Sequence, residues 1–91
     1  MGSKANKLPL GNQAAVGAVI RSSTDLGVAV RERRKELELT QADIAGIGRT
    51  GNRFIVELEN GKPTIQLQKA LDVMDLLGLE VIVQPKSARS L

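Results

Sequence analysis

The sequence predicts an all-α domain of four short helices, followed by one β-strand near the C-terminus. Apolar residues recur at helical spacing between residues 24 and 78, and glycine, asparagine and proline interrupt this pattern between the helices. Residues 79–84 are instead a β-branched run bounded by Gly78 and Pro85, which is typical of a strand. A chain of 91 residues has room for one small domain with a modest core.

The first helix is expected over residues 24–37. Thr24 is a suitable N-cap, and Asp25 in the first turn suits the positive end of the helix dipole. One face, which we expect in the core, carries the apolar residues Leu26, Ala29, Val30 and Leu37. The other face carries the basic residues Arg31, Arg33, Arg34 and Lys35.

The second helix is expected to begin at Thr40, because residues 40–43 have the spacing of a capping box. It is short. We expect it to bury Ile44 and Ala45 and to break at residues 46–48, where two glycines flank an isoleucine.

The third helix is expected from Gly51 or Asn52 to Glu59, where the following asparagine and glycine stop it. The fourth is expected over residues 64–78, directly after Pro63. Its core stripe is formed by Leu67, Ala70, Leu71, Met74 and Leu77. Outside this stripe lie the apolar residues Ile65, Val73 and Leu76. A helix that is apolar on more than one face is usually buried on more than one side.

The strand at residues 79–84 needs a partner, since a lone strand leaves its backbone groups unpaired. Two partners are possible: residues 19–21 of the same chain, or the equivalent strand of a second chain. In the first case the strand and the N-terminal arm cover the apolar surface within one chain. The second case predicts a homodimer whose interface contains Ile65, Val73, Leu76, Leu79, Val81, Ile82 and Val83.

Charge divides the chain into three parts. Residues 1–23 carry three basic residues and no acid, and they are expected to form a flexible arm. Residues 85–91 are expected to form a flexible basic tail, and the folded domain is expected over residues 24–84. Within that domain, residues 31–53 carry six bases and four acids, whereas residues 54–84 carry two bases and five acids. The basic half favours a polyanion partner.

The composition excludes several function classes. Because the chain has no cysteine and no histidine, disulfides, the usual zinc sites, thiol nucleophiles and imidazole bases are excluded. We therefore expect no enzyme activity, no metal and no cofactor. Phe54 is the only aromatic residue, so a base-stacking platform is not expected. The apolar run at residues 14–20 is too short for a membrane span or a typical secretory signal, which predicts a cytoplasmic protein.

Two short helices joined by a brief turn have the organisation of a helix-turn-helix, whose second helix enters the DNA major groove. The residues in and around this pair resemble, without a gap, the XRE/lambda-repressor-like helix-turn-helix family over residues 26–78. The matching residues are Leu39, Thr40, Gln41, Ile44, Ala45, Phe54, Ile55, Leu58, Glu59, Gly61 and Lys62. Residues 53–64, with a strand after the fourth helix, are most similar to the HipB-type antitoxins that accompany HipA-type kinase toxins.

The resemblance implies a transcriptional repressor that binds double-stranded operator DNA as a homodimer and neutralises a HipA-like serine/threonine kinase toxin. Two alternatives stay open: a stand-alone repressor of the same family without a toxin, and a protein-interaction adaptor that no longer binds DNA. The basic first half of the domain argues against the adaptor.

The resemblance also implies roles for individual residues. The first turn of the third helix reads bases through Asn52 and Arg53, since arginine pairs well with guanine and asparagine with adenine. One turn later, Val56 is a candidate for contact with a thymine methyl group. Glu57 either accepts a hydrogen bond from cytosine or repels phosphate.

Phosphate contacts are expected around the two short helices. Gln41 lies at the start of the second helix, where free N–H groups attract anions. After the third helix, Asn60, Gly61 and Lys62 are expected to contact phosphate through backbone N–H groups and a basic side chain. In the turn between the helices, the family usually has glycine, an apolar residue, and serine or threonine. Here the turn reads Arg49, Thr50 and Gly51, which are therefore added as candidate phosphate contacts.

Two further positions concern the scaffold. The family pairs the arginine matching Arg34 with the glutamate matching Glu59, which would join the first and third helices; the alternative is a solvated surface pair. Glu38 stands where the family usually has a glycine in the left-handed conformation, at a cost of about 1 kcal/mol if that conformation is kept.

Overall fold

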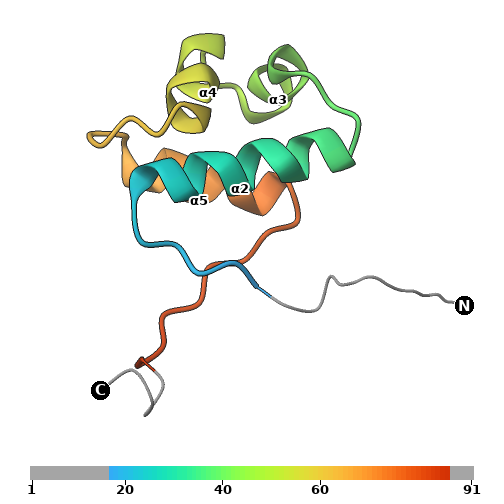
Figure 1. The fold of residues 1–91 in the computed structure, drawn as a ribbon. Coiled ribbons are helices and arrows are strands. Elements are labelled where there is room, and N and C mark those ends of the chain that lie inside the picture. The colour runs from blue at the N-terminus through green and yellow to red at the C-terminus, as the bar shows by residue number, and fades with distance from the viewer. Residues whose placement is uncertain (1–16, 87–91) are drawn as a thin grey trace, which may run out of the picture.

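The computed structural model describes residues 17–86, which form four helices and, within that range, no strand (Figure 1). The helices are α2 (Ser23–Glu36), α3 (Gln41–Gly48), α4 (Asn52–Glu59) and α5 (Leu67–Leu76). Figure 1 shows α3 and α4 together on one side of α2, whereas the segments before α2 and after α5 leave on the opposite side. The all-α class with four helices is confirmed.

Helix α2 begins one residue earlier than expected, and its N-cap is Ser22 rather than Thr24. The Ser22 hydroxyl accepts a hydrogen bond from the Asp25 N–H at 3.0 Å. The Asp25 carboxylate in turn accepts one from the Arg21 N–H at 2.8 Å. The first of these bonds satisfies an N–H that a helix start leaves free, and the second ties the residue before the N-cap to the first turn, which explains the earlier boundary.

The chain reverses direction between α2 and α3 at Glu38. This residue keeps the left-handed conformation, with φ of 59°, although it is not a glycine. The reversal lets the Leu39 N–H donate to the Arg34 carbonyl at 3.1 Å. It also leads directly into Thr40 and the start of α3.

The capping box of α3 forms as expected. The Thr40 hydroxyl accepts from the Asp43 N–H at 3.0 Å, and the Asp43 carboxylate accepts from the Thr40 N–H at 2.8 Å. These bonds from Thr40 lower the pKa of the Asp43 carboxyl. The expected break at residues 46–48 was wrong, because α3 continues through Gly48 and ends at Arg49, which is left-handed with φ of 56°.

Helix α4 has the expected bounds and ends in a loop that packs on the start of α2. Gly61 is left-handed, with φ of 79°, and it is buried. A Cβ at this position would lie 2.7 Å from the Cα of Thr24. The Ser23 hydroxyl donates to the Gly61 carbonyl at 2.8 Å. Only glycine fits both the conformation and the close approach.

Helix α5 begins three residues later than expected. Residues 63 and 64 belong to a turn in which the Ile65 N–H donates to the Lys62 carbonyl at 3.2 Å. Gln66 is the N-cap, and its side-chain oxygen accepts from the Lys69 N–H at 2.7 Å. Residues 64–66, expected in the first turn of this helix, are therefore not helical.

The buried face of α5 agrees with the expected stripe at Ala70, Met74 and Leu77 and differs from it at Leu67 and Val73. The core stripe consists of Ala70, Val73, Met74 and Leu77. Leu67, expected in the core, is 65% exposed. Val73, expected at a dimer interface, is only 2% exposed and lies in the core of one chain. Its assignment to the interface was wrong.

The core is aliphatic and lies where the four helices meet. Its other buried members are Val30, Ile44, Ala45, Ile55 and Leu58. Leu26 and Phe54 pack against its margin. Leu37, expected in the core, is exposed because α2 has ended at Glu36.

Residues 79–86 follow α5 without forming a sheet. No backbone hydrogen bond between residues 17–22 and 79–86 is present in the described chain, so the intrachain pairing expected as one alternative does not form. Leu79 packs against the core, whereas Val81, Ile82 and Val83 are exposed, Val83 by 96%. Residues 1–16 and 87–91, which make up most of the predicted arm and tail, lie outside the described residues.

Among the helices described, none combines the length and the apolar character needed to cross a membrane.

Two glycines inside helices provide a matched test of the packing. Gly27 faces α4, and a Cβ there would lie 2.5 Å from the Glu59 carbonyl oxygen. Gly46 in α3 has nothing within 4 Å of the corresponding point. We expect Gly27→Ala to lower the free energy of unfolding by about 1–3 kcal/mol through overpacking. Gly46→Ala should raise it by up to about 1 kcal/mol, because alanine favours helix. Urea denaturation measures both, and equal signs would contradict the packing described.

Candidate functional site

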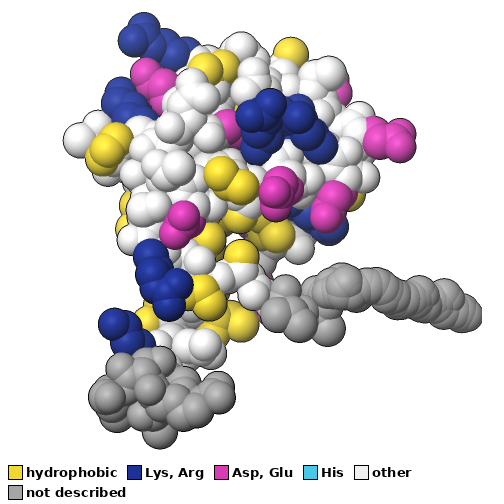
Figure 2. Space-filling view, viewed as in Figure 1, with side chains coloured by type: hydrophobic (Ala, Val, Ile, Leu, Met, Phe, Trp, Pro, Cys, Tyr) yellow, Lys and Arg dark blue, Asp and Glu magenta, His cyan; other side chains and the backbone are white. Residues whose placement is uncertain are grey.

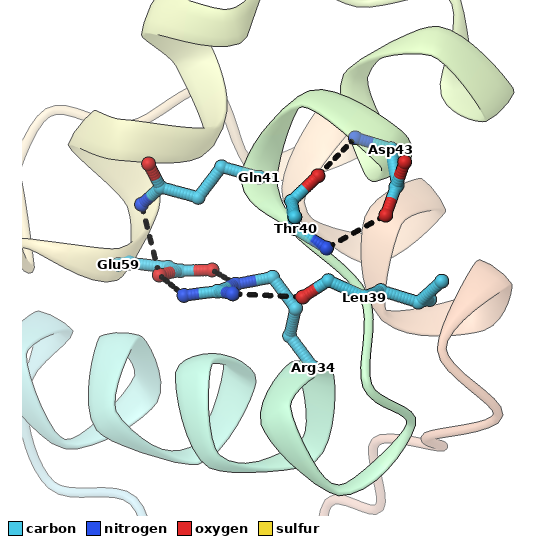
Figure 3. Close-up of polar contacts among 6 residues, drawn as sticks. All are labelled: Arg34, Leu39, Thr40, Gln41, Asp43 and Glu59. Atoms are coloured by element: carbon cyan, nitrogen blue, oxygen red, sulfur yellow. Dashed lines mark hydrogen bonds and ion pairs between the residues drawn. The ribbon is translucent and has the colours of Figure 1, made fainter.

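A buried ion pair joins α2 to α4 and organises the surface around it (Figure 3). Arg34 Nε lies 2.6 Å from Glu59 Oε2, and Arg34 Nη2 lies 3.0 Å from Glu59 Oε1. The two side chains are 11% and 2% exposed, respectively. The pair implied by the family resemblance therefore forms, with bidentate geometry, and it is buried rather than solvated.

The remaining hydrogen-bonding groups of this pair are also used. Arg34 Nη1 donates to the Leu39 carbonyl at 2.9 Å. The Gln41 side-chain amide donates to Glu59 Oε1 at 3.0 Å. Figure 3 shows that these contacts connect α2, the start of α3 and the end of α4. Gln41, expected to bind phosphate, thus contributes its side chain to the scaffold.

The electrostatics of the pair favour its charged form. Burial would raise the pKa of Glu59, but the hydrogen bonds from Arg34 and Gln41, together with the charges of Arg34 and Arg31, lower that pKa overall. For Arg34, the hydrogen bond to Glu59 raises the pKa more than burial lowers it. Both groups are therefore ionised at neutral pH.

The N-terminus of α4 is open to solvent. Gly51 is its N-cap and supplies no side-chain hydrogen bond to the first turn. The first two residues of the helix, Asn52 and Arg53, are both exposed, and the Arg53 side chain is 89% exposed. Val56 is half-buried one turn later. The N–H groups of an uncapped first turn, next to exposed polar side chains, suit an anionic partner.

Glu57 lies between two cations of the same surface. Its Oε2 is 3.2 Å from Arg53 Nε, and its Oε1 is 3.3 Å from Lys62 Nζ. The hydrogen bonds from Arg53 and then Lys62 lower the pKa of the Glu57 carboxyl. Both carboxylate oxygens are thus engaged within the chain.

The loop after α4 differs from the expectation in one respect. Its backbone N–H groups, from Asn60, Gly61 and Lys62, donate to carbonyls of α4 at 3.0–3.1 Å. They are not free to bind phosphate, and Gly61 is buried. The expected backbone contact was wrong for this loop because the chain closes tightly on the end of the helix. The exposed side chains of Asn60 and Lys62 remain available.

The turn between α3 and α4 contains three candidate phosphate contacts, Arg49, Thr50 and Gly51, of which Thr50 is the least exposed. Arg49 is exposed, whereas Thr50 is half-buried, and its N–H donates to the Ala45 carbonyl at 3.0 Å. The Arg49 side chain is therefore the more accessible.

A hollow on α2 was not identified from the sequence. It has a volume of about 360 Å³ and is lined by Val28, by two basic residues, Arg31 and Lys35, and by two acidic residues, Glu32 and Glu59. Figure 2 shows Lys and Arg side chains on the displayed face of the molecule, with Asp and Glu side chains beside them. The basic face expected for α2 is thus divided: Arg33 donates to the Leu77 carbonyl at 2.8 Å and Arg34 is buried, which leaves Arg31 and Lys35 beside the hollow. Because Arg31 and Lys35 are four residues apart, they lie on the same face of the helix, and the sequence could have indicated this.

The comparisons with known proteins identify a regulator with a similar sequence and solved structures with a similar fold. No protein-family model matches the chain. The uncharacterised HTH-type transcriptional regulator y4mF of Sinorhizobium fredii is 45% identical over 71 residues, covering 77% of this chain and 93% of that protein. A HipB variant in a complex with the 20mer O2 has a TM-score of 0.73 at 22% identity, covering 79% of this chain and 100% of that chain. A HipB complex with the 20mer O4 has a TM-score of 0.72 at 21% identity, covering 78% and 100%.

The buried pair predicts a specific pattern of stability. Arg34→Met and Glu59→Leu each leave one buried charge without its partner, so each should lower the free energy of unfolding by about 3–5 kcal/mol. The double variant Arg34→Met/Glu59→Leu removes both charges and should lose much less than the sum. Urea denaturation at pH 7 gives all four values. Additive losses would show that the two side chains do not interact.

Proposed function

Because the chain belongs to the XRE-like helix-turn-helix family of transcriptional regulators, we propose that it is a repressor that binds operator DNA as a homodimer and serves as the antitoxin of a HipA-like kinase. The observation that carries the DNA-binding part is the open N-terminus of α4, where Asn52 and Arg53 are exposed on a helix held by the buried ion pair. Members of the family are DNA-binding proteins, not enzymes.

In the proposed complex, α4 lies in the major groove. Arg53 contacts guanine and Asn52 contacts adenine, because these pairings match the groove edges of the bases. Val56 lies against a thymine methyl group. These contacts specify sequence, whereas contacts to phosphate set the position of the protein on the duplex.

Phosphate contacts surround the recognition helix. We assign them to the side chains of Arg49, Thr50, Asn60 and Lys62 and to the backbone at Gly51. Gln41 contributes through the free N–H at the start of α3, since its side chain is bonded to Glu59. Arg31 and Lys35 extend the phosphate-binding surface along α2, beside the hollow. Together these residues supply the basic surface that a polyanion requires.

The proposed dimer uses the opposite side of the molecule. Residues 79–84 pair with the same strand of a second copy, which covers the exposed side chains of Val81, Ile82 and Val83. Leu76, Leu79 and Ile65 border this surface. Two recognition helices then enter successive major grooves on one face of the duplex, about 34 Å apart.

The antitoxin role rests on the similarity in fold to HipB and on the exposed acidic residues Asp72, Asp75 and Glu80, which are available to a protein partner. Its test is whether the adjacent reading frame encodes a HipA-like kinase and whether that kinase co-purifies with this chain over a range of salt concentrations. Retention of the kinase supports an antitoxin. Loss of the kinase at every salt concentration, with DNA binding intact, supports a stand-alone repressor.

Two single variants separate sequence reading from general attraction to DNA. Arg53→Ala should remove about 1–3 kcal/mol of discrimination between operator and random duplex, because a bidentate base contact is lost. Lys62→Ala should weaken binding to both duplexes equally and reduce the salt slope by about 0.9. Fluorescence anisotropy titrations in a salt series measure both effects. Unchanged discrimination in Arg53→Ala would overturn the recognition-helix assignment, and the absence of any salt-dependent binding by the wild type would favour the adaptor alternative.

The dimer surface has its own prediction. Ile82→Asp places a charge in the proposed strand pair and should convert the dimer to a monomer at micromolar concentration. Ile47→Asp is the control, because Ile47 is also exposed but lies on α3, on the other side of α2. Sedimentation equilibrium measures the mass of each variant. A dimer that survives Ile82→Asp would exclude this strand from the interface.

A further inference from the structure

We propose that Glu57 is a positioning residue for DNA recognition: it orients the Arg53 guanidinium toward the groove and does not itself read a base. This inference rests on the proposed DNA-binding function. It concerns one carboxylate that contacts two cations, one on the recognition helix and one on the loop that follows it.

The contact between Glu57 and Arg53 uses Nε of the guanidinium and not its two terminal nitrogens, which are the atoms suited to contact a base. Glu57 Oε2 accepts from Arg53 Nε at 3.2 Å, and in residues 17–86 neither terminal nitrogen of Arg53 has a hydrogen-bond partner. The two terminal nitrogens form a planar fork, and such a fork can donate two parallel hydrogen bonds to guanine O6 and N7. A bond at Nε restricts the rotation of a side chain that is otherwise 89% exposed. Less conformational entropy is then lost when Arg53 binds a base.

Glu57 is itself held in place. Its second oxygen lies 3.3 Å from Lys62 Nζ, and its side chain is 28% exposed. With one oxygen on each cation, the Glu57 carboxylate is held between Arg53 and Lys62. Each oxygen keeps a further lone pair, but rotation of the carboxylate toward cytosine would lengthen at least one of these contacts. The same two contacts hold Lys62 near the proposed DNA surface. While Arg53 and Lys62 are paired with Glu57, neither cation is fully free to bind phosphate.

Removing the carboxylate should therefore have two opposite effects. Arg53 and Lys62 become free to bind phosphate, and one negative charge near the DNA disappears, so binding to random duplex becomes stronger. At the same time, the orientation of Arg53 is lost, so the preference for the base pair that Arg53 reads becomes weaker. A merely structural role for Glu57 would change stability but not the base preference.

The test uses the full-length protein and a pool of duplexes with a randomised core. Selection with the wild type defines the preferred sequence, and binding to each single-base-pair substitution of that sequence is then measured for Glu57→Ala, Arg53→Ala and the double variant. We expect Glu57→Ala to reduce the preference for the selected base pair roughly tenfold at the position affected by Arg53→Ala. The preference at every other base pair should not change. The double variant should lose no more than Arg53→Ala alone, because the two residues act through one contact.

Two further variants complete the comparison. Glu57→Gln removes the charge but keeps a side-chain oxygen that accepts from Arg53 Nε, so it should retain most of the discrimination. Glu36→Gln is the control: Glu36 is also an ion-paired carboxylate, with Oε1 3.3 Å from Arg33 Nη1, but it lies at the end of α2 and its side chain is 66% exposed, against 28% for Glu57. It should leave every base preference unchanged. Alanine at position 57 favours helix, and the variants are expected to fold.

Each other outcome overturns a defined claim. If Glu57→Ala changes the preference at a base pair that Arg53→Ala leaves intact, Glu57 reads that base directly and the inference is wrong. If Glu57→Ala changes no base preference, the contact to Arg53 has no part in recognition. If the wild type selects no sequence from the pool, the proposed function itself fails, and the inference fails with it.

Discussion

The arrangement of this small domain depends on the buried pair between Arg34 and Glu59. A short helix of eight residues has little stability of its own, so α4 keeps its orientation only through contacts with its neighbours. The bidentate pair supplies a directional contact to α2, and the Gln41 amide extends it to α3. Close to it, the absence of a side chain at Gly27 allows the two helix backbones to approach. The direction in which Arg53 is presented follows from these contacts.

This scaffold separates two surfaces. Helices α3 and α4 lie on one side of α2, and the segment after α5 leaves on the other side (Figure 1). A protein that contacts DNA with the first surface can therefore bind a second copy or another protein with the second. The net charge of +3 conceals this separation, because much of the excess comes from the terminal segments. Within the domain, the position of each charge matters more than the total.

Much of the fold follows from local rules. The capping box at Thr40 and Asp43 and the bounds of α4 depend on neighbours within a few residues, and both were predicted. The family resemblance pointed to position 38 as the place of a left-handed residue, and Glu38 has that conformation. The misses occurred where distant parts of the chain meet. The turn at residues 63–66 delays the start of α5, and the core buries Val73 instead of Leu67. Periodicity shows that a helix is apolar on more than one face, but it does not show which face a neighbouring element will cover.

The candidate site shows the same difference between what the sequence predicts and what only the tertiary structure decides. By itself, the sequence determined the helix-turn-helix order, because spacing and residue type carry that information. The family resemblance that the sequence carries implied the roles of positions 52 and 53 and the pairing of Arg34 with Glu59. Only the tertiary structure decided how each polar group is used: the Gln41 amide bonds to Glu59, the N–H groups of residues 60–62 bond to α4, and Glu57 holds both Arg53 and Lys62. The physical reason is that a hydrogen-bonding group engages whichever partner the fold brings within about 3 Å. Residues far apart in the sequence supply several of those partners.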